Sequence, residues 1–120
     1  MMVGYSILLN ETKDPEGRHI GMWDGYKPDH SLIVAWIGTI STVEQDDLSI
    51  CEELFEMFNI NHPKGYKNRS LSVGDVVLLT HYRNISGGWK EAASVKAYKV
   101  DRVGFVEISN PAEAQIVGRS

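Results

Sequence analysis

The most distinctive stretch of the chain runs Arg69-Ser70-Leu71-Ser72-Val73-Gly74-Asp75-Val76-Val77. Within it, Gly74 supplies the positive φ that a tight turn can require, and Asp75 can accept a hydrogen bond from a nearby backbone N–H. Ser70 and Ser72 can satisfy further backbone groups at the start of a strand. Apolar residues continue through residues 76–80 on both faces, so the stretch predicts a turn followed by a strand that is buried on both sides.

Upstream of this turn the apolar residues recur at helical spacing. They predict a helix over residues 46–58 with a buried stripe made of Leu48, Cys51, Leu54, Phe55 and Phe58. His62 and Pro63 then prevent the helix from continuing. Further upstream, residues 4–10 alternate and predict a strand with Tyr5, Ile7 and Leu9 on one face. Residues 31–40 are nearly continuously apolar and predict a central strand that is covered on both faces.

The segments between and after these elements complete the expected fold. Residues 11–30 read as a long connection with a short hairpin arm near residues 19–23, and residues 94–100 and 104–108 as strands. Residues 81–93 read as a loop and residues 111–120 as a loose C-terminal tail. We therefore predict an α+β fold: one globular domain over residues 1–110, with a small mixed, mostly antiparallel sheet and one main helix packed on a face.

Two runs of sequence resemble the YodL-like domain of bacterial mobile elements, plasmids and phages. The first run has the form F-N-x-x-x-P-x-x-Y-x-x-x-S-L-S-V-G-D-V-V, and here it comprises Phe58, Asn59, Pro63, Tyr66 and residues 70–77. The second has the form A-Y-x-V-D-x-x-G-F, and here it comprises Ala97, Tyr98, Val100, Asp101, Gly104 and Phe105. The resemblance covers residues 51–109. Residues 81–96 are longer than the connection usual in the family, and residues 1–40 match no pattern of it.

The resemblance implies an accessory protein of a phage or other mobile element, and it implies no catalytic residues, because none are established for the family. Taken as chemistry, the two runs look mainly architectural: Tyr98 and Phe105 are large enough to seal the sheet against the helix. The alternative interpretation is that the runs form a binding surface.

Composition and charge narrow the function classes. The chain has 120 residues, 42% of them hydrophobic, with one cysteine and a net charge of −4, which excludes a generally basic nucleic-acid binder. A single cysteine forms no internal disulfide, and we find neither a signal peptide nor an apolar run near the roughly 20 residues of a membrane helix. We therefore expect a soluble cytoplasmic protein that does not bind a membrane.

The charges are unevenly distributed along the chain. Residues 1–61 contain eleven acidic and three basic side chains, whereas residues 62–102 contain eight basic and three acidic ones. Basic and aromatic residues interleave in the second part, as phosphate contact and base stacking require, in a candidate binding group of Tyr66, Lys67, Arg69, His81, Tyr82, Arg83, Trp89 and Lys90. The alternative is that these aromatic residues belong to the core and these cations to an ordinary surface.

Catalytic and metal motifs are missing from the sequence. The four histidines and Cys51 show no ligand spacing, and Gly87-Gly88 lacks the lysine and hydroxyl of a phosphate-binding loop. We predict no metal site, cofactor or catalytic residue. The favoured function is a non-enzymatic accessory protein that binds a host or element protein. The alternative is a nucleic-acid-binding module that uses the basic segment 62–102, and the charge asymmetry also allows self-association.

Overall fold

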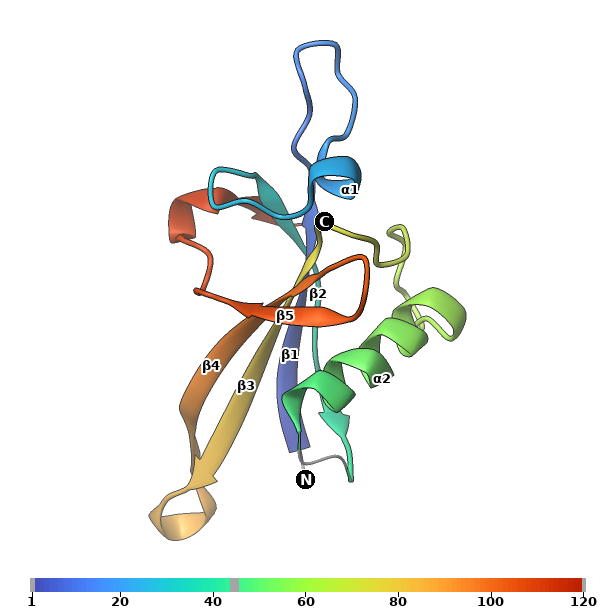
Figure 1. Ribbon diagram of the computed structural model, residues 1–120. Helices are drawn as coiled ribbons and strands as arrows, with labels where there is room; N and C mark the ends of the chain where they lie inside the picture. The colour runs from blue at the N-terminus through green and yellow to red at the C-terminus, as the bar shows by residue number, and fades with distance from the viewer. Residues whose placement is uncertain (1, 44–45, 120) are drawn as a thin grey trace.

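A computed structural model describes residues 2–43 and 46–119 and shows one six-stranded sheet with a main helix on one face (Figure 1). The strands lie in the order β5-β4-β3-β1-β2-β6, and every pair is antiparallel except β2 with β6. This arrangement confirms the predicted α+β fold. The strands are β1 (Met2–Asn10), β2 (Leu32–Ser41), β3 (Val76–Asn84), β4 (Lys90–Val100), β5 (Phe105–Ile108) and β6 (Ile116–Arg119). The helices are α1 (Gly21–Asp24) and α2 (Asp47–Ile60), with 3₁₀ turns η1 (Ser86–Gly88) and η2 (Glu113–Gln115). No helix in the described ranges has the length and apolar character needed to cross a membrane.

The most buried strand is β1, which lies between β2 and β3. Its residues Tyr5, Ile7 and Leu9 pack in the main core beneath α2, as predicted, while Leu8 packs in a second cluster on the opposite face. The prediction that residues 31–40 form a central strand covered on both faces was wrong. β2 lies next to the edge strand β6 and is only partly buried. The uninterrupted apolar residues 7–9 are what allow β1 to be buried on both sides.

Helix α2 packs through a stripe that differs from the predicted one at its start. Cys51, Leu54 and Phe58 are fully buried as predicted, but Leu48 is 45% exposed and Ile50 is buried instead. The stripe runs back through position 47, because positions 47, 50, 51, 54 and 58 follow the spacing of a single helix face. Asp47 occupies that position, and Asp46 caps the helix by accepting a hydrogen bond from Leu48 N.

Two segments that we expected to be irregular belong to the sheet. The predicted loop 81–93 instead extends β3 and β4 into a long hairpin that projects from the body and turns at η1 (Figure 1). The expected loose tail instead forms η2 and β6, and β6 pairs in parallel with the start of β2. Ile116 fixes this end of the chain by packing with Leu32 in the second apolar cluster. The expected hairpin arm near residues 19–23 is replaced by a single bridge between Lys13 and His19, followed by α1.

Candidate functional site

The turn before β3 is held by a buried carboxylate. Asp75 is fully buried and accepts hydrogen bonds from the backbone N–H groups of Asn10 and Ser72, each at 2.8 Å. The Arg69 guanidinium donates to both oxygens of the same carboxylate at 2.7 Å. The prediction that Asp75 bonds a nearby N–H is confirmed, and the network ties the end of β1 to the start of β3.

Gly74 lies where three segments cross. Its φ is +94°, as the turn required, and its N–H donates to Val100 O at 3.1 Å. A Cβ atom at this position would lie 2.4 Å from Gly21 O, so only glycine fits without displacing the backbone that leads into α1. The first motif run is thereby held against both the second run and the N-terminal connection.

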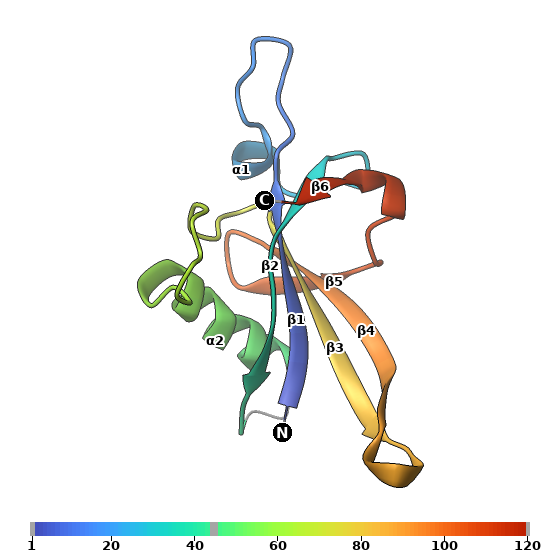
Figure 2. The same ribbon diagram turned by 180° about the vertical axis from the view of Figure 1, so that it is seen from behind.

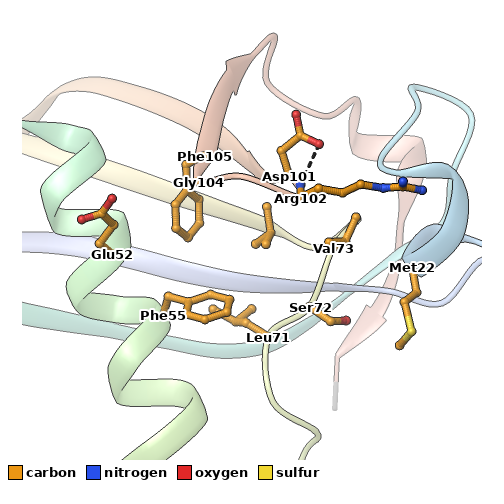
Figure 3. A pocket seen from close by; sticks show the side chains of 11 residues that line it. Met22, Glu52, Phe55, Leu71, Ser72, Val73, Asp101, Arg102, Gly104 and Phe105 are labelled. Carbon is orange, nitrogen blue, oxygen red and sulfur yellow. Dashed lines mark hydrogen bonds between the residues drawn. The ribbon is translucent and has the colours of Figure 1, made fainter.

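Between these segments and α2 lies a groove of about 530 Å³, which we call the motif groove (Figure 3). Both motif runs line it: residues 71–73 on one side and residues 100, 101, 104 and 105 on the other. The Phe55 ring from α2 meets the Phe105 ring edge-on, with 6.1 Å between their centroids. The runs that looked mainly architectural therefore also form the wall of an open, largely apolar groove.

The rim of the motif groove carries exposed apolar side chains. Met22 of α1 lines it and is 52% exposed, and Val103, in the turn between β4 and β5, is 90% exposed. Arg102 donates from its guanidinium to Trp23 O at 3.1 Å, and this bond links that turn to α1. Glu52 and Asp101 add two carboxylates, and Arg102 one guanidinium, to a lining that is otherwise mostly apolar. Exposed apolar residues gathered around a groove are typical of surfaces that bind another molecule.

The predicted basic and aromatic group does not form one surface. Tyr66 is buried, donates its hydroxyl to Arg69 O and packs edge-on against Phe58. Arg69 is committed to Asp75, and Lys67 is exposed nearby. These three residues lie before β3, whereas the other five lie in its second half or beyond it, roughly 17–26 Å from its start at the usual rise of a strand.

The five distant residues differ in their surroundings. His81 is hydrogen-bonded to Asp47 at 2.6 Å, and Arg83 pairs with Glu91 across the hairpin. Tyr82 and Lys90 are exposed, and Trp89 near the tip is 73% exposed. The hairpin tip therefore presents one free aromatic ring, while both of the group's arginines are already engaged with carboxylates.

Asp47 also fixes the helix against the sheet. Its second oxygen accepts a hydrogen bond from the Tyr98 hydroxyl at 2.5 Å, and burial raises the pKa of that hydroxyl. The nearby Cys51 is fully buried, and burial raises the pKa of its thiol to about 12, so it stays protonated and unreactive. Among the residues that the structure describes, no group of three or more His, Cys, Asp or Glu side chains is placed to hold a metal ion.

Sequence reasoning missed the residues that make the motif groove a site. Met22 and Phe55 line it from segments far apart in the chain, and Val103 lies in a third segment, the turn between the lining residues Arg102 and Gly104; only Phe55 was singled out, as part of the helix stripe. A usable signal existed: Met22 and Val103 are large apolar residues in segments that are otherwise polar or rich in glycine.

Comparison with known proteins gives one match. The model of the YodL-like domain matches residues 27–110, which include α2, both motif runs and all of β2 to β5. The match begins at residue 27, well before the stretch 51–109 in which the motifs were found, so the expectation that residues 1–40 match no pattern of the family was wrong for residues 27–40. Neither the curated proteins nor the solved structures contain a match to the chain.

Proposed function

Because the chain belongs to the YodL-like domain family, we propose that it is a non-enzymatic accessory protein of a phage or other mobile element. It acts in the cytoplasm by binding a protein of the host or of the element. One observation carries this proposal: the two motif runs, which are separated in sequence, converge on a single open apolar groove.

The groove suits a protein segment more than a polar small molecule. Phe55, Leu71 and Phe105 line it, together with the exposed Met22 at its rim, and the exposed Val103 lies in the adjoining turn, between the lining residues Arg102 and Gly104. An apolar side chain of a partner that enters between the two phenylalanines would remove these surfaces from water, which is the main favourable term in protein association. Among the charged side chains of the lining, the two carboxylates of Glu52 and Asp101 outnumber the guanidinium of Arg102, which favours a basic residue beside that apolar anchor.

The nucleic-acid alternative receives less support from the geometry. Arg69 and Arg83 are each paired with a carboxylate and lie at opposite ends of β3. A duplex would have to contact both ends while avoiding the acidic residues of α2. We expect no mobility shift of short DNA or RNA at about 150 mM salt, because the chain has a net charge of −4 and both arginines of the candidate group are already paired with carboxylates.

Affinity capture tests the proposal. The tagged protein is incubated with lysate of the bacterium that carries the gene, with and without nuclease treatment, in parallel with the variants Met22→Lys and Val103→Lys. Both side chains are exposed at the rim, so lysine is tolerated by the fold but places a charge where the apolar anchor would dock. The matched control is Val117→Lys, because Val117 is also exposed but lies on β6 at the opposite edge of the sheet.

We expect the wild-type protein and the Val117→Lys variant to retain the same protein and both rim variants to lose it. Capture that survives both rim substitutions would contradict binding through the motif groove. Capture that disappears on nuclease treatment would favour the nucleic-acid alternative. The mobile-element origin is tested separately by the genes that flank the coding sequence: neighbours without any phage or plasmid functions would contradict it.

A further inference from the structure

The outer edge of β2 is only half covered. β6 pairs with β2 at Leu32, Ile33 and Val34 and then ends (Figure 2). Beyond that point, over residues 35–41, no strand in the described part of the chain pairs with the outer edge of β2, although its inner edge is paired with β1 down to Ser41. Ile37 on this length is 55% exposed.

This free edge lacks most of the features by which proteins protect edges. Natural edge strands carry charges, proline or bulges that prevent another strand from pairing with them. Residues 35–41 read Ala-Trp-Ile-Gly-Thr-Ile-Ser, without a charge or a proline. The one register shift between β1 and β2 leaves Ala35 as the extra residue, and residues 36–41 continue without a further shift. Residues 36–41 are therefore a ready template for an added strand, as residues 32–34 of the same strand already show by pairing with β6.

A hollow of about 760 Å³ lies beside the free edge, on the side of the sheet that faces α2. Gly38 has no side chain there, and the Tyr5 ring occupies the space where its Cβ would be. Trp36 and Met57 form two further walls. In an added strand, every second side chain would point toward α2, and the one beside Gly38 would enter this hollow.

The charges on this side of the hollow have one sign. Glu53 and Glu56 line it from α2, and within the described residues neither carboxylate has a basic partner at ion-pair distance. Glu53 accepts a hydrogen bond from the Thr42 hydroxyl, whereas Glu56 is exposed. A lysine or arginine two positions from the apolar residue in the hollow would lie on the same face and within reach of these carboxylates.

From this geometry we propose that the β2 edge over residues 35–41 binds an extended segment of another protein as an additional strand, in line with β6. The segment carries an apolar side chain for the hollow beside Gly38 and basic side chains at alternate positions for Glu53 and Glu56. Main-chain hydrogen bonds supply the affinity, and the alternate side chains supply the specificity. This binding surface is separate from the motif groove. The two proposals have in common only that each surface binds a protein.

A second copy of the chain fits this edge poorly. Two β2 edges paired around a twofold axis near Gly38 would bring two α2 helices together on the same side of the sheet. Glu53 and Glu56 of one copy would then face the same two carboxylates of the other, and like charges placed together oppose association.

The test uses the full chain, labelled with ¹⁵N, and three seven-residue peptides. The probe has the sequence Thr-Lys-Thr-Leu-Thr-Lys-Thr. The second peptide has glutamate in place of both lysines, and the third has proline at two of the threonine positions. We expect the probe to slow amide exchange at residues 35–41 and the other two to have no effect. In a Glu53→Gln/Glu56→Lys variant the probe should bind about tenfold more weakly. The fold should be retained, because the glutamine carbonyl can still accept the Thr42 bond and Glu56 is exposed.

Two controls separate this surface from others. Glu107→Lys reverses a charge on the other edge region, at β5, and Val103→Lys blocks the motif groove; neither should change binding of the probe. Loss of binding in Val103→Lys, with normal binding to the Glu53→Gln/Glu56→Lys variant, would place the peptide in the motif groove and overturn the proposal. Unchanged amide exchange over residues 35–41 with every peptide would overturn it, and so would a dimer in sedimentation that Ile37→Lys dissociates.

Discussion

Replacing Asp75 with alanine should be among the most destabilising single changes in the described part of the chain. The carboxylate is fully buried and accepts four short hydrogen bonds, two from backbone N–H groups and two from Arg69. In the variant the N–H groups of Asn10 and Ser72 lose their partner, at about 1–3 kcal/mol for each buried group. The Arg69 side chain is 39% exposed and regains water, so its contribution is smaller. We expect a total loss of about 3–5 kcal/mol.

The assay is urea denaturation at pH 7, followed by circular dichroism, for Asp75→Ala, Arg69→Leu and the double variant. Native domains are stable by about 5–15 kcal/mol, so the Asp75→Ala variant should still fold, with a lower midpoint and an unchanged slope. Arg69→Leu leaves the buried Asp75 carboxylate without its partner. The losses of unfolding free energy in the two single variants should therefore add up to about 0.5–3 kcal/mol more than the loss in the double variant. A loss below about 1 kcal/mol for Asp75→Ala, or strict additivity, would refute this reasoning.

Three further predictions follow from the same structure. Gly74→Ala should lower the free energy of unfolding more than Gly17→Ala does. Both substitutions cost about 1–2 kcal/mol because of the positive φ, but of these two positions only at 74 would the new Cβ meet a backbone oxygen. Equal melting temperatures of the two variants would contradict this close approach. Leu54→Ala should cost about 2–5 kcal/mol, and Leu48→Ala about 0.5 kcal/mol or less, because only Leu54 is buried; equal losses in urea denaturation would contradict the corrected stripe. Burial lowers the pKa of His30, so the unfolded chain binds a proton at this imidazole more tightly than the folded chain does. The free energy of unfolding should therefore keep its full value above about pH 6.5 and decrease as the pH falls below that. The decrease should be smaller in His30→Gln.

Local features of the fold could be predicted from the sequence because local chemistry determines them. Only glycine readily adopts the backbone conformation at position 74, and a carboxylate directly after that turn has backbone donors within reach. The α2 stripe was predictable for the same reason, apart from its first turn. There Asp47 occupies the core-facing position and is satisfied by Tyr98 and His81, two residues far along the chain. No helical pattern in one segment can reveal partners of that kind.

The arrangement of strands and the site itself depend on contacts between distant segments. β1 and β2 are both apolar, and which of them lies inside is decided by β3, which pairs with β1 and leaves β2 toward the edge. The β3–β4 hairpin was missed because its outer half is exposed on both faces and therefore lacks an alternating apolar pattern. The motif groove is lined by residues of α1, α2 and two turns, so no single stretch of sequence could predict it.

Photocrosslinking from the rim of the motif groove tests the central claim most directly. A benzophenone amino acid is placed at Val103, which is 90% exposed beside the groove, and in parallel at Val117 on β6. After irradiation in nuclease-treated lysate, the account predicts one covalent adduct with a partner protein from position 103, none from position 117, and loss of the adduct when Met22→Lys is added. The same adducts from both positions, or none from position 103, would contradict it.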